Sequence, residues 1–248
     1  TSGTDTYNTA VGHAAGNYIT TGLYNTLIGG LTGDAITTGD HNVALGVSAL
    51  TSNTASNKNV AIGSNSLGQM NVTSDTDTYN TAVGYAAGAV INTGVQNTLI
   101  GGLAGDAITT GGYNTAIGGK SLTGATTGAQ NFAGGYQALE TNTTGSYNVG
   151  VGVNALRLNT TADNNTAVGH ASLSANTTGA ENTAVGSLSL DANTTGTRNT
   201  GIGSESLSAN TEGTDNTATG KNSLATNTTG NYNSSFGRNS LFSNTTAS

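Results

Sequence analysis

The sequence predicts an all-β protein that folds as a parallel β-solenoid of about fourteen coils, built from a seventeen-residue repeat. An asparagine opens a segment close to N-T-A-V-G at a fixed spacing, and a glycine stands four residues after each of these asparagines. The composition agrees, because 38 glycines, no proline and 8% charged residues match neither a common globular domain nor a typical disordered chain. Repeats of fixed length are typical of solenoids, in which each repeat packs on its neighbours.

The repeat is regular along the whole chain. Its opening asparagine stands at positions 8, 25, 42, 59, 80, 97, 114, 131, 148, 165, 182, 199, 216 and 233. Successive asparagines are seventeen positions apart, except that Asn80 follows Asn59 after twenty-one. We number the seventeen positions of a repeat from this asparagine, and residues at equivalent positions form a column.

A longer unit is superimposed on the short one. The segment TDTYNTAVG at 4–12 returns at 76–84, which makes the longer period seventy-two positions. We therefore predict that residues 1–248 form a single repeat array, in which a block at 1–72 is duplicated at 73–144. Four inserted residues lie within 69–79.

One coil of this length has room for two or three short strands joined by tight corners. Alternation along T-A-V-G places Thr9 and Val11 on one face and Ala10 on the other. Gly12 and Gly22 are expected at corners that need a positive φ. Helices are disfavoured because glycine and threonine are poor helix formers, and hairpins because the chain has no Asn-Gly dipeptide.

Four columns indicate how the interior is filled. Column 4 is apolar in most repeats, as at Val11 and Ile28, and we interpret it as a core column. Column 9 is leucine in ten repeats and glycine in four, and those four repeats carry isoleucine in column 12, where most others have asparagine. One apolar slot per coil is thus filled from either column. Column 3 is mostly alanine, and we expect its small flat face to pack against another copy.

Asparagine and glycine columns complete the predicted scaffold. Stacked asparagines 4.7–4.9 Å apart are expected to hydrogen-bond along the ladder, which lets them tolerate burial. The structural positions that we assign are Asn8, Gly12, Asn25, Gly29, Asn165, Gly169, Leu173 and Asn176.

The variants NVAIG at 59–63 and NTAIG at 114–118 resemble the head repeats of YadA-like trimeric autotransporter adhesins. The longer repeat form with ALxxNTTG is still more similar to β-roll repeats of phage tail fibres. The resemblance covers essentially the whole chain, although the adhesin repeat is usually shorter than this one. It implies a left-handed β-roll that assembles as a homotrimeric rod and displays a binding surface outside the cell or on a virion.

Composition limits the partners that we expect. The net charge is −7, with six lysines and arginines and no basic run, which disfavours nucleic acid. No apolar run approaches the roughly 18 residues of a membrane helix, so we expect no membrane insertion. The expected partners are further copies of the chain and a host-surface glycan or receptor.

The sequence offers no catalytic constellation, and we expect no cofactor. Asp75 and Asp77 in the insertion are candidate Ca²⁺ ligands, with an exposed bulge as the alternative; the related segment near Asp5 is a second place to look. His13, His41 and His170 are expected as surface side chains.

Two further columns carry candidate surface chemistry. Acidic residues of column 10 are expected to be solvated charges or a row that hydrogen-bonds carbohydrate; they are Asp34, Asp106, Glu140 and Asp191. Six tyrosines of column 17 either cover the coil corner or stack on sugars; they are Tyr7, Tyr24, Tyr79, Tyr113, Tyr147 and Tyr232.

The leading functional hypothesis is a non-enzymatic fibre or adhesin segment, either a phage tail-fibre shaft or a cell-surface adhesin head, that attaches to a host or surface. One alternative is an ice-binding or self-assembling extracellular solenoid, although adjacent threonines such as Thr177 and Thr178 point to opposite faces. A polysaccharide-degrading tailspike is the second alternative and needs a carboxylate pair roughly 5–9.5 Å apart.

Overall fold

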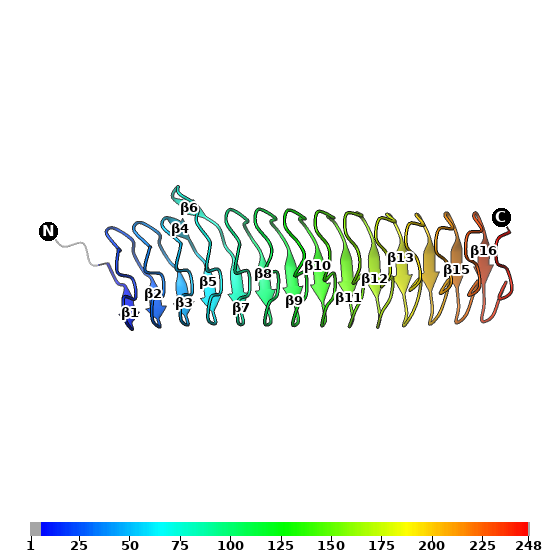
Figure 1. The fold of residues 1–248 in the computed structure, drawn as a ribbon, viewed down its shortest axis with the longest axis horizontal. Helices are drawn as coiled ribbons and strands as arrows, with labels where there is room; N and C mark the ends of the chain where they lie inside the picture. The colour runs from blue at the N-terminus through cyan, green and yellow to red at the C-terminus, as the bar shows by residue number, and fades with distance from the viewer. Residues whose placement is uncertain (1–5, 248) are drawn as a thin grey trace. The chain divides into compact units, whose positions relative to one another are not determined.

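The computed structural model describes residues 6–247, and within this range the regular secondary structure is short β-strands without any helix. The chain falls into two compact units, Thr1–Gly119 and Lys120–Ser248. Each unit is a parallel β-solenoid in which coil follows coil in chain order (Figure 1). The predicted fold class is therefore confirmed.

The strands mark the coils of each unit. In the first unit they are β1 (Thr9–Val11), β2 (Thr26–Ile28), β3 (Val43–Leu45), β4 (Ser56–Asn57), β5 (Val60–Ile62), β6 (Thr76–Asp77), β7 (Thr81–Val83), β8 (Thr98–Ile100) and β9 (Thr115–Ile117). In the second unit they are β10 (Phe132–Gly134), β11 (Val149–Val151), β12 (Thr166–Val168), β13 (Thr183–Val185), β14 (Thr200–Ile202), β15 (Thr217–Thr219) and β16 (Ser234–Phe236). All except β4 and β6 cover columns 2 to 4.

Successive strands pair in parallel and in register, so equivalent residues of neighbouring coils are partners. Between β12 and β13, Thr166 pairs with Thr183 and Val168 with Val185, which is one repeat further along the chain. Between β5 and β7, Val60 pairs with Thr81. Both residues belong to column 2, so the coil that contains the insertion also pairs with its neighbour in register. The four inserted residues therefore leave the columns in register.

The insertion leaves the coil wall as a projection. β6 pairs with β4 in a separate two-stranded parallel sheet, where Asn57 lies opposite Asp77. Figure 1 shows β6 standing out from the coils of the first unit, and residues 73–75 are exposed. This projection has the form of the exposed bulge, which is the alternative to a metal site. The related segment near Asp5 lies outside the described residues.

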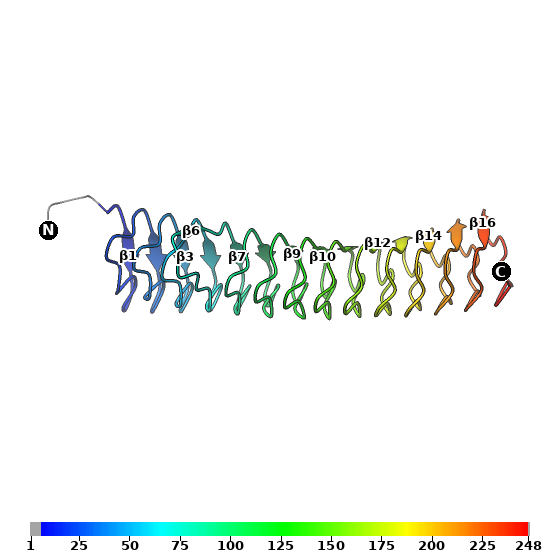
Figure 2. The ribbon, with the colours of Figure 1, turned by 90° about the horizontal axis from the view of Figure 1, so that it is seen from above.

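Each coil contains one three-residue strand in its main sheet, fewer than the two or three strands expected. Columns 7, 9 and 17 adopt left-handed backbone conformations even without glycine, as at Ala171 (φ 50°), Leu173 (φ 53°) and Glu181 (φ 61°). Such residues turn the chain and interrupt extended geometry. Backbone hydrogen bonds between coils still hold the other walls, for example from Leu173 N to Ser189 O at 2.9 Å. In Figure 2 the strands of successive coils follow one another along each unit.

The strand faces are oriented the opposite way from the prediction. Column 3 points inward, and Ala44 and Ala167 have no exposed surface. Column 4 points outward, and Val11 is 57% exposed, Leu45 47% and Ile28 38%. The interpretation of column 4 as core is therefore wrong, as is the assignment of column 3 to packing between copies. The narrow interior already holds the leucine of column 9, which leaves room opposite it for a small side chain.

The compensation between columns 9 and 12 is confirmed, and column 3 also takes part in it, through Leu27. A Cβ placed on Gly33 would lie 2.9 Å from Ile36 Cδ1 and 2.8 Å from Leu27 Cδ2. Both of those side chains are fully buried, so they occupy the volume that leucine fills in other coils. The coil of Gly105 repeats this arrangement with its own isoleucine and leucine.

Column 5 requires glycine for two reasons. Gly12, Gly29 and Gly46 are vertical neighbours with φ of 133°, 140° and 135°, and a Cβ on Gly29 would lie 2.6 Å from Gly46 O. Gly22 in column 15 differs from the expectation, since its φ is not positive. A Cβ there would lie 2.6 Å from Gly39 O, so the close approach of the next coil is what excludes a side chain.

Candidate functional site

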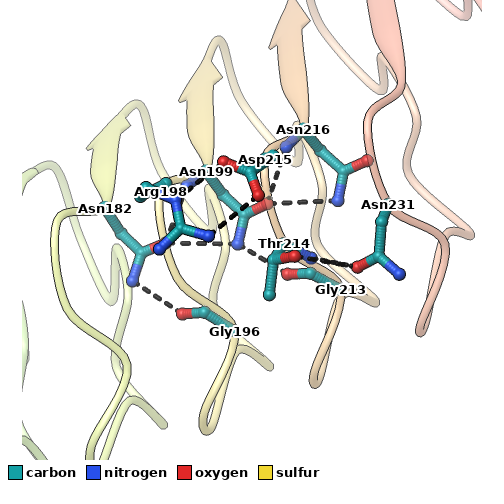
Figure 3. A network of polar contacts seen from close by, with 9 residues as sticks. All are labelled: Asn182, Gly196, Arg198, Asn199, Gly213, Thr214, Asp215, Asn216 and Asn231. Atoms are coloured by element: carbon teal, nitrogen blue, oxygen red, sulfur yellow. Dashed lines mark hydrogen bonds and ion pairs between the residues drawn. The ribbon is translucent and has the colours of Figure 1, made fainter.

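The column 1 asparagines form a buried ladder in each unit. Asn199 Oδ1 accepts hydrogen bonds from the backbone N–H and from Nδ2 of Asn216, both at 3.1 Å (Figure 3). Its own Nδ2 donates to Asn182 Oδ1 at 3.2 Å and to Gly213 O at 2.7 Å. These bonds satisfy the buried amide, and they tie each coil to both the backbone and the side chain of the next. The predicted ladder is confirmed.

A second asparagine ladder runs through column 12 of the second unit. Asn176 Nδ2 donates to Asn159 Oδ1 at 2.8 Å and to Gly179 O at 2.9 Å, and Asn193 continues the row at 2.9 Å. Leu173 lies beside it, fully buried. Since Asn176 is buried, the recurring Asn-Thr-Thr segment is part of the scaffold and not an accessible glycosylation site.

The assigned ladder positions nearest the chain start behave in the same way. Asn25 Nδ2 donates to Asn8 Oδ1 at 3.1 Å, and the Asn25 backbone N–H donates to the same oxygen at 2.8 Å. Asn165 Oδ1 accepts from Asn182 in the same pattern, and Gly169 repeats the φ of column 5 at 135°. These positions carry the fold, so binding must be sought on the outward columns.

Column 17 of the first unit carries a stack of exposed rings. Tyr7 and Tyr24 are parallel with ring centroids 5.4 Å apart, and Tyr24 and His41 stack at 4.8 Å. Tyr24 is therefore covered by a ring on each face. A sugar stacks on an open ring face, so Tyr24 is not available for that contact. Tyr113, Tyr147 and Tyr232 remain exposed, with no ring stacked on them in the described part of the chain.

The insertion contacts column 17 through an ion pair. Lys58 Nζ forms a salt bridge with Asp77 and lies 5.1 Å from the centroid of the Tyr79 ring. The hydrogen bond from Lys58 lowers the pKa of the Asp77 carboxyl, and the same contact raises the pKa of Lys58. Asp75 Oδ1 accepts from Asn57 Nδ2 at 2.6 Å. The structure thus brings both Ca²⁺ candidates to one amide, with the Lys58 cation already paired to Asp77.

Column 17 of the second unit carries charges in three successive coils, at Glu181, Arg198 and Asp215. Arg198 makes a two-pronged contact with Asp215, from Nε at 2.8 Å and from a terminal guanidinium nitrogen at 2.9 Å (Figure 3). The hydrogen bond from Arg198 lowers the pKa of Asp215, and the pair raises the pKa of Arg198. Glu181, one coil before, adds to the attraction at Arg198.

The acidic residues of column 10 do not form one common site. Asp34 accepts a hydrogen bond from Thr51 at 2.6 Å, and Glu140 lies 3.7 Å from Arg157. Asp191 is half-buried, and burial raises the pKa of its carboxyl, with Glu205 adding repulsion. Its Oδ1 has no hydrogen-bond partner within the described residues. The row is therefore a set of separate environments.

The outward side of the main sheet is an apolar surface that the sequence-based prediction placed in the core. Columns 2 and 4 form this surface, which we call the outer sheet face. Phe236 of column 4 is 70% exposed, and nine aliphatic residues of the same column are 36–57% exposed; they are Val11, Ile28, Leu45, Ile100, Ile117, Val151, Val168, Val185 and Ile202. Column 2 adds threonine in most coils, and these hydroxyls have no partner within residues 6–247. The signal lay in the alternation of T-A-V, whose direction the sequence left open.

Groups that commonly mark other sites are dispersed. His13, His41 and His170 are exposed, as expected. Among the described residues, no three histidine, cysteine, aspartate or glutamate side chains gather in a way that could hold a metal ion. In the same range, no helix has the length and apolarity needed to cross a bilayer.

Comparison with protein-family models, curated proteins and solved structures finds no match to this chain.

Proposed function

We propose that the chain is a non-enzymatic structural segment of an extracellular or virion-surface fibre or adhesin that attaches to a host or surface. The observation that carries this proposal is that some columns are buried and hardly vary, whereas others are exposed and vary between repeats. Columns 1, 3 and 5 are buried or tightly packed and nearly constant, and column 9 is leucine or glycine, whereas columns 6 and 17 are mostly exposed and variable. A scaffold that tolerates change on its outward columns suits a surface-displayed binding array.

The resemblance to adhesin and tail-fibre repeats supports the same proposal. It adds assembly as a homotrimer with left-handed coils, and a host-surface glycan or receptor as the partner. For a glycan, the contacts that column 17 offers are Tyr113, Tyr147 and Tyr232, because their rings are exposed and unstacked. The Tyr7–Tyr24–His41 stack serves the coil corner instead.

The test is binding of the labelled chain to intact host cells and to an array of purified polysaccharides. We expect saturable binding that weakens about tenfold in the triple variant Tyr113→Ser, Tyr147→Ser, Tyr232→Ser. The matched control is Thr144→Ser, Thr161→Ser, Thr178→Ser, which alters an exposed column without removing rings. An absence of saturable binding to every surface tested contradicts the proposed attachment role.

A second candidate, ice binding, is favoured by one observation. The column 2 threonines present unpartnered hydroxyls in register, and most of them stand two residues before an exposed β-branched side chain. This places a hydroxyl and methyl groups at i and i+2 on one face, which adjacent threonines cannot do. Thermal hysteresis in the wild-type chain that is lost in Thr166→Val, Thr183→Val, Thr200→Val supports this function, and no hysteresis rejects it.

A further inference from the structure

The outer sheet face repeats an apolar side chain at an outward position in almost every coil. In column 4, twelve of the fourteen residues are valine, isoleucine, leucine or phenylalanine, and the exceptions are Gly134 and Thr219. An isolated exposed apolar residue needs no explanation, but a continuous apolar surface marks an interaction site.

The fourteen repeats provide an internal alignment that separates this face from the most variable ones. Charged residues occur in columns 6, 7, 10, 14, 16 and 17, for example at Lys221, Glu205, Asp191 and Arg198. Columns 2 and 4 carry no charge in any repeat. Columns 11 and 13 also lack charge, but they carry mostly small or polar side chains, whereas column 4 combines the absence of charge with exposed valine, isoleucine, leucine and phenylalanine. This combination indicates a desolvated surface.

We propose that the outer sheet face is where copies of this chain meet one another. The inference deepens the self-association in the proposed function by naming its surface, and it does not depend on what the assembly attaches to. The chain has a net charge of −7, so two copies repel each other most weakly through a face that lacks charge. Because successive coils present similar side chains in register, the face is complementary to itself at each step of one coil.

The size of the face is sufficient for a stable contact. Each unit contains seven main-sheet strands of three residues. Strands about 4.8 Å apart, with about 3.3 Å per residue, give a face of roughly 340 Å² per unit. A unit of one copy that meets a unit of another through this face buries roughly 680 Å² in total. Two such pairs of units exceed the roughly 1,000 Å² expected of a specific interface.

The side chains also favour protein over water as the occupant. Thirteen of the fourteen column 4 residues lack a hydroxyl, so that half of the face offers water no hydrogen bond. Branched aliphatic side chains in parallel, in-register strands pack well in dry sheet-to-sheet contacts. The threonine methyls of column 2 suit the same contact.

The experiment compares two triple variants that each introduce three aspartates into the same three coils. The aspartates of one variant lie in column 4, and those of the other lie two residues later, in column 6. The first is Val168→Asp, Val185→Asp, Ile202→Asp on the outer sheet face. The control is His170→Asp, Ser187→Asp, Ser204→Asp in column 6 of the same coils, where Lys221 and Arg238 occur naturally. Mass is measured by light scattering and sedimentation on the full chain, and circular dichroism verifies that both variants fold.

We expect the wild-type chain and the column 6 control to form the same oligomer of two or three copies. The column 4 variant should fall to the 24.3 kDa monomer, with at least a tenfold weaker association constant. A monomeric wild-type chain at about 100 μM overturns the proposal, as does a folded column 4 variant that keeps the wild-type mass. If the column 4 variant does not fold, Val168→Asp alone against Ser187→Asp alone repeats the comparison. Attachment to cells is read separately, so its failure does not decide this outcome.

Discussion

Four coils of the first unit, those with glycine in column 9, have a different interior from the coils of the second unit. In the first unit, coils such as that of Gly33 fill the apolar slot with isoleucine from column 12 and leucine from column 3. In the second unit, leucine fills column 9 and frees column 12 for a row of asparagines; that row is Asn142, Asn159, Asn176, Asn193, Asn210 and Asn227. The column 1 ladder occurs in both units, so it is the shared element.

The comparison teaches which features the coil needs and which it can exchange. Column 1 asparagines bond to the backbone N–H of the next coil, as Asn182 Oδ1 does with Asn199 N at 3.0 Å, and thus fix the spacing between coils. Column 12 asparagines bond to one another's side chains and to a carbonyl, which isoleucine can replace when it fills volume instead. Column 17 is freer still, with stacked rings in one unit and an Arg198–Asp215 pair in the other.

The largest expected effect is equal in the two units. Gly169→Ala in the second unit and Gly101→Ala in the first each place a Cβ 2.6 Å from the backbone of the next glycine, at φ of 135° and 138°. We expect each to lower the free energy of unfolding by about 3–5 kcal/mol, as a clash added to a strained φ. Urea denaturation measures this, and a loss below about 1 kcal/mol for either variant breaks the shared role of column 5.

A swap of interiors sharpens the comparison. Leu173→Gly alone removes a fully buried leucine and should cost about 2–5 kcal/mol. Asn176→Ile alone leaves ladder partners unsatisfied and should cost about 1–3 kcal/mol. The double variant recreates the glycine and isoleucine pair of the first unit, so its cost should fall short of the sum by at least about 1.5 kcal/mol. Strict additivity in a double-mutant cycle contradicts the compensation.

The two ladders should differ in strength within the second unit. Asn199→Ala removes the acceptor of a backbone N–H together with three amide contacts, and we expect a loss of about 2–4 kcal/mol. Asn193→Ala removes no bond to a backbone N–H and should cost about 1–2 kcal/mol. Denaturation midpoints rank the two variants. If Asn193→Ala proves the costlier one, column 1 is not the shared element.

The smallest effect is the pH dependence of the column 17 ion pair. Because Arg198 lowers the pKa of Asp215 in the folded chain, the pair stabilises above the usual carboxyl pKa of 3.8 and loses this contribution as pH falls through the lower folded value. Arg198→Gln should reduce the change in melting temperature between pH 5 and pH 2. Tyr24→Phe in the first unit should keep the wild-type dependence of melting temperature on pH, because its ring stack contains no carboxylate. Equal pH profiles for wild type and Arg198→Gln count against the pair.

Much of this fold could be predicted because the fourteen repeats of the chain can be aligned with one another. The period set the register, the glycine column set the corner at Gly12, and exchange between Leu173-type and Ile36-type residues identified the apolar slot. The face of the strand could not be predicted, since a period of two separates Ala10 from Val11 without stating which is inside. That choice depends on which side chain fits beside the leucine of column 9, which already lies in the interior.

The surface chemistry was predicted less well than the scaffold. The position of the column 17 tyrosines was clear from the sequence, but whether neighbours would cover them was not. Stacking of Tyr24 between Tyr7 and His41 depends on rings being one coil apart, whereas Tyr113 and Tyr147 have no such neighbour among the described residues. Pairing of Asp77 with Lys58 depends on the path of the inserted residues, which the repeat does not specify.

Cross-linking tests the vertical stacking of coils most directly, and the chain has no native cysteine to interfere. Thr178→Cys with Thr195→Cys places thiols in one exposed column of adjacent coils, where strand spacing brings Cα atoms within the roughly 4.4–6.8 Å that a disulfide spans. Under mild oxidation this pair should close almost completely within one chain. Thr178→Cys with Glu212→Cys, two coils apart, should stay reduced. Efficient closure of the second pair, or failure of the first, would contradict stacking at one coil per repeat.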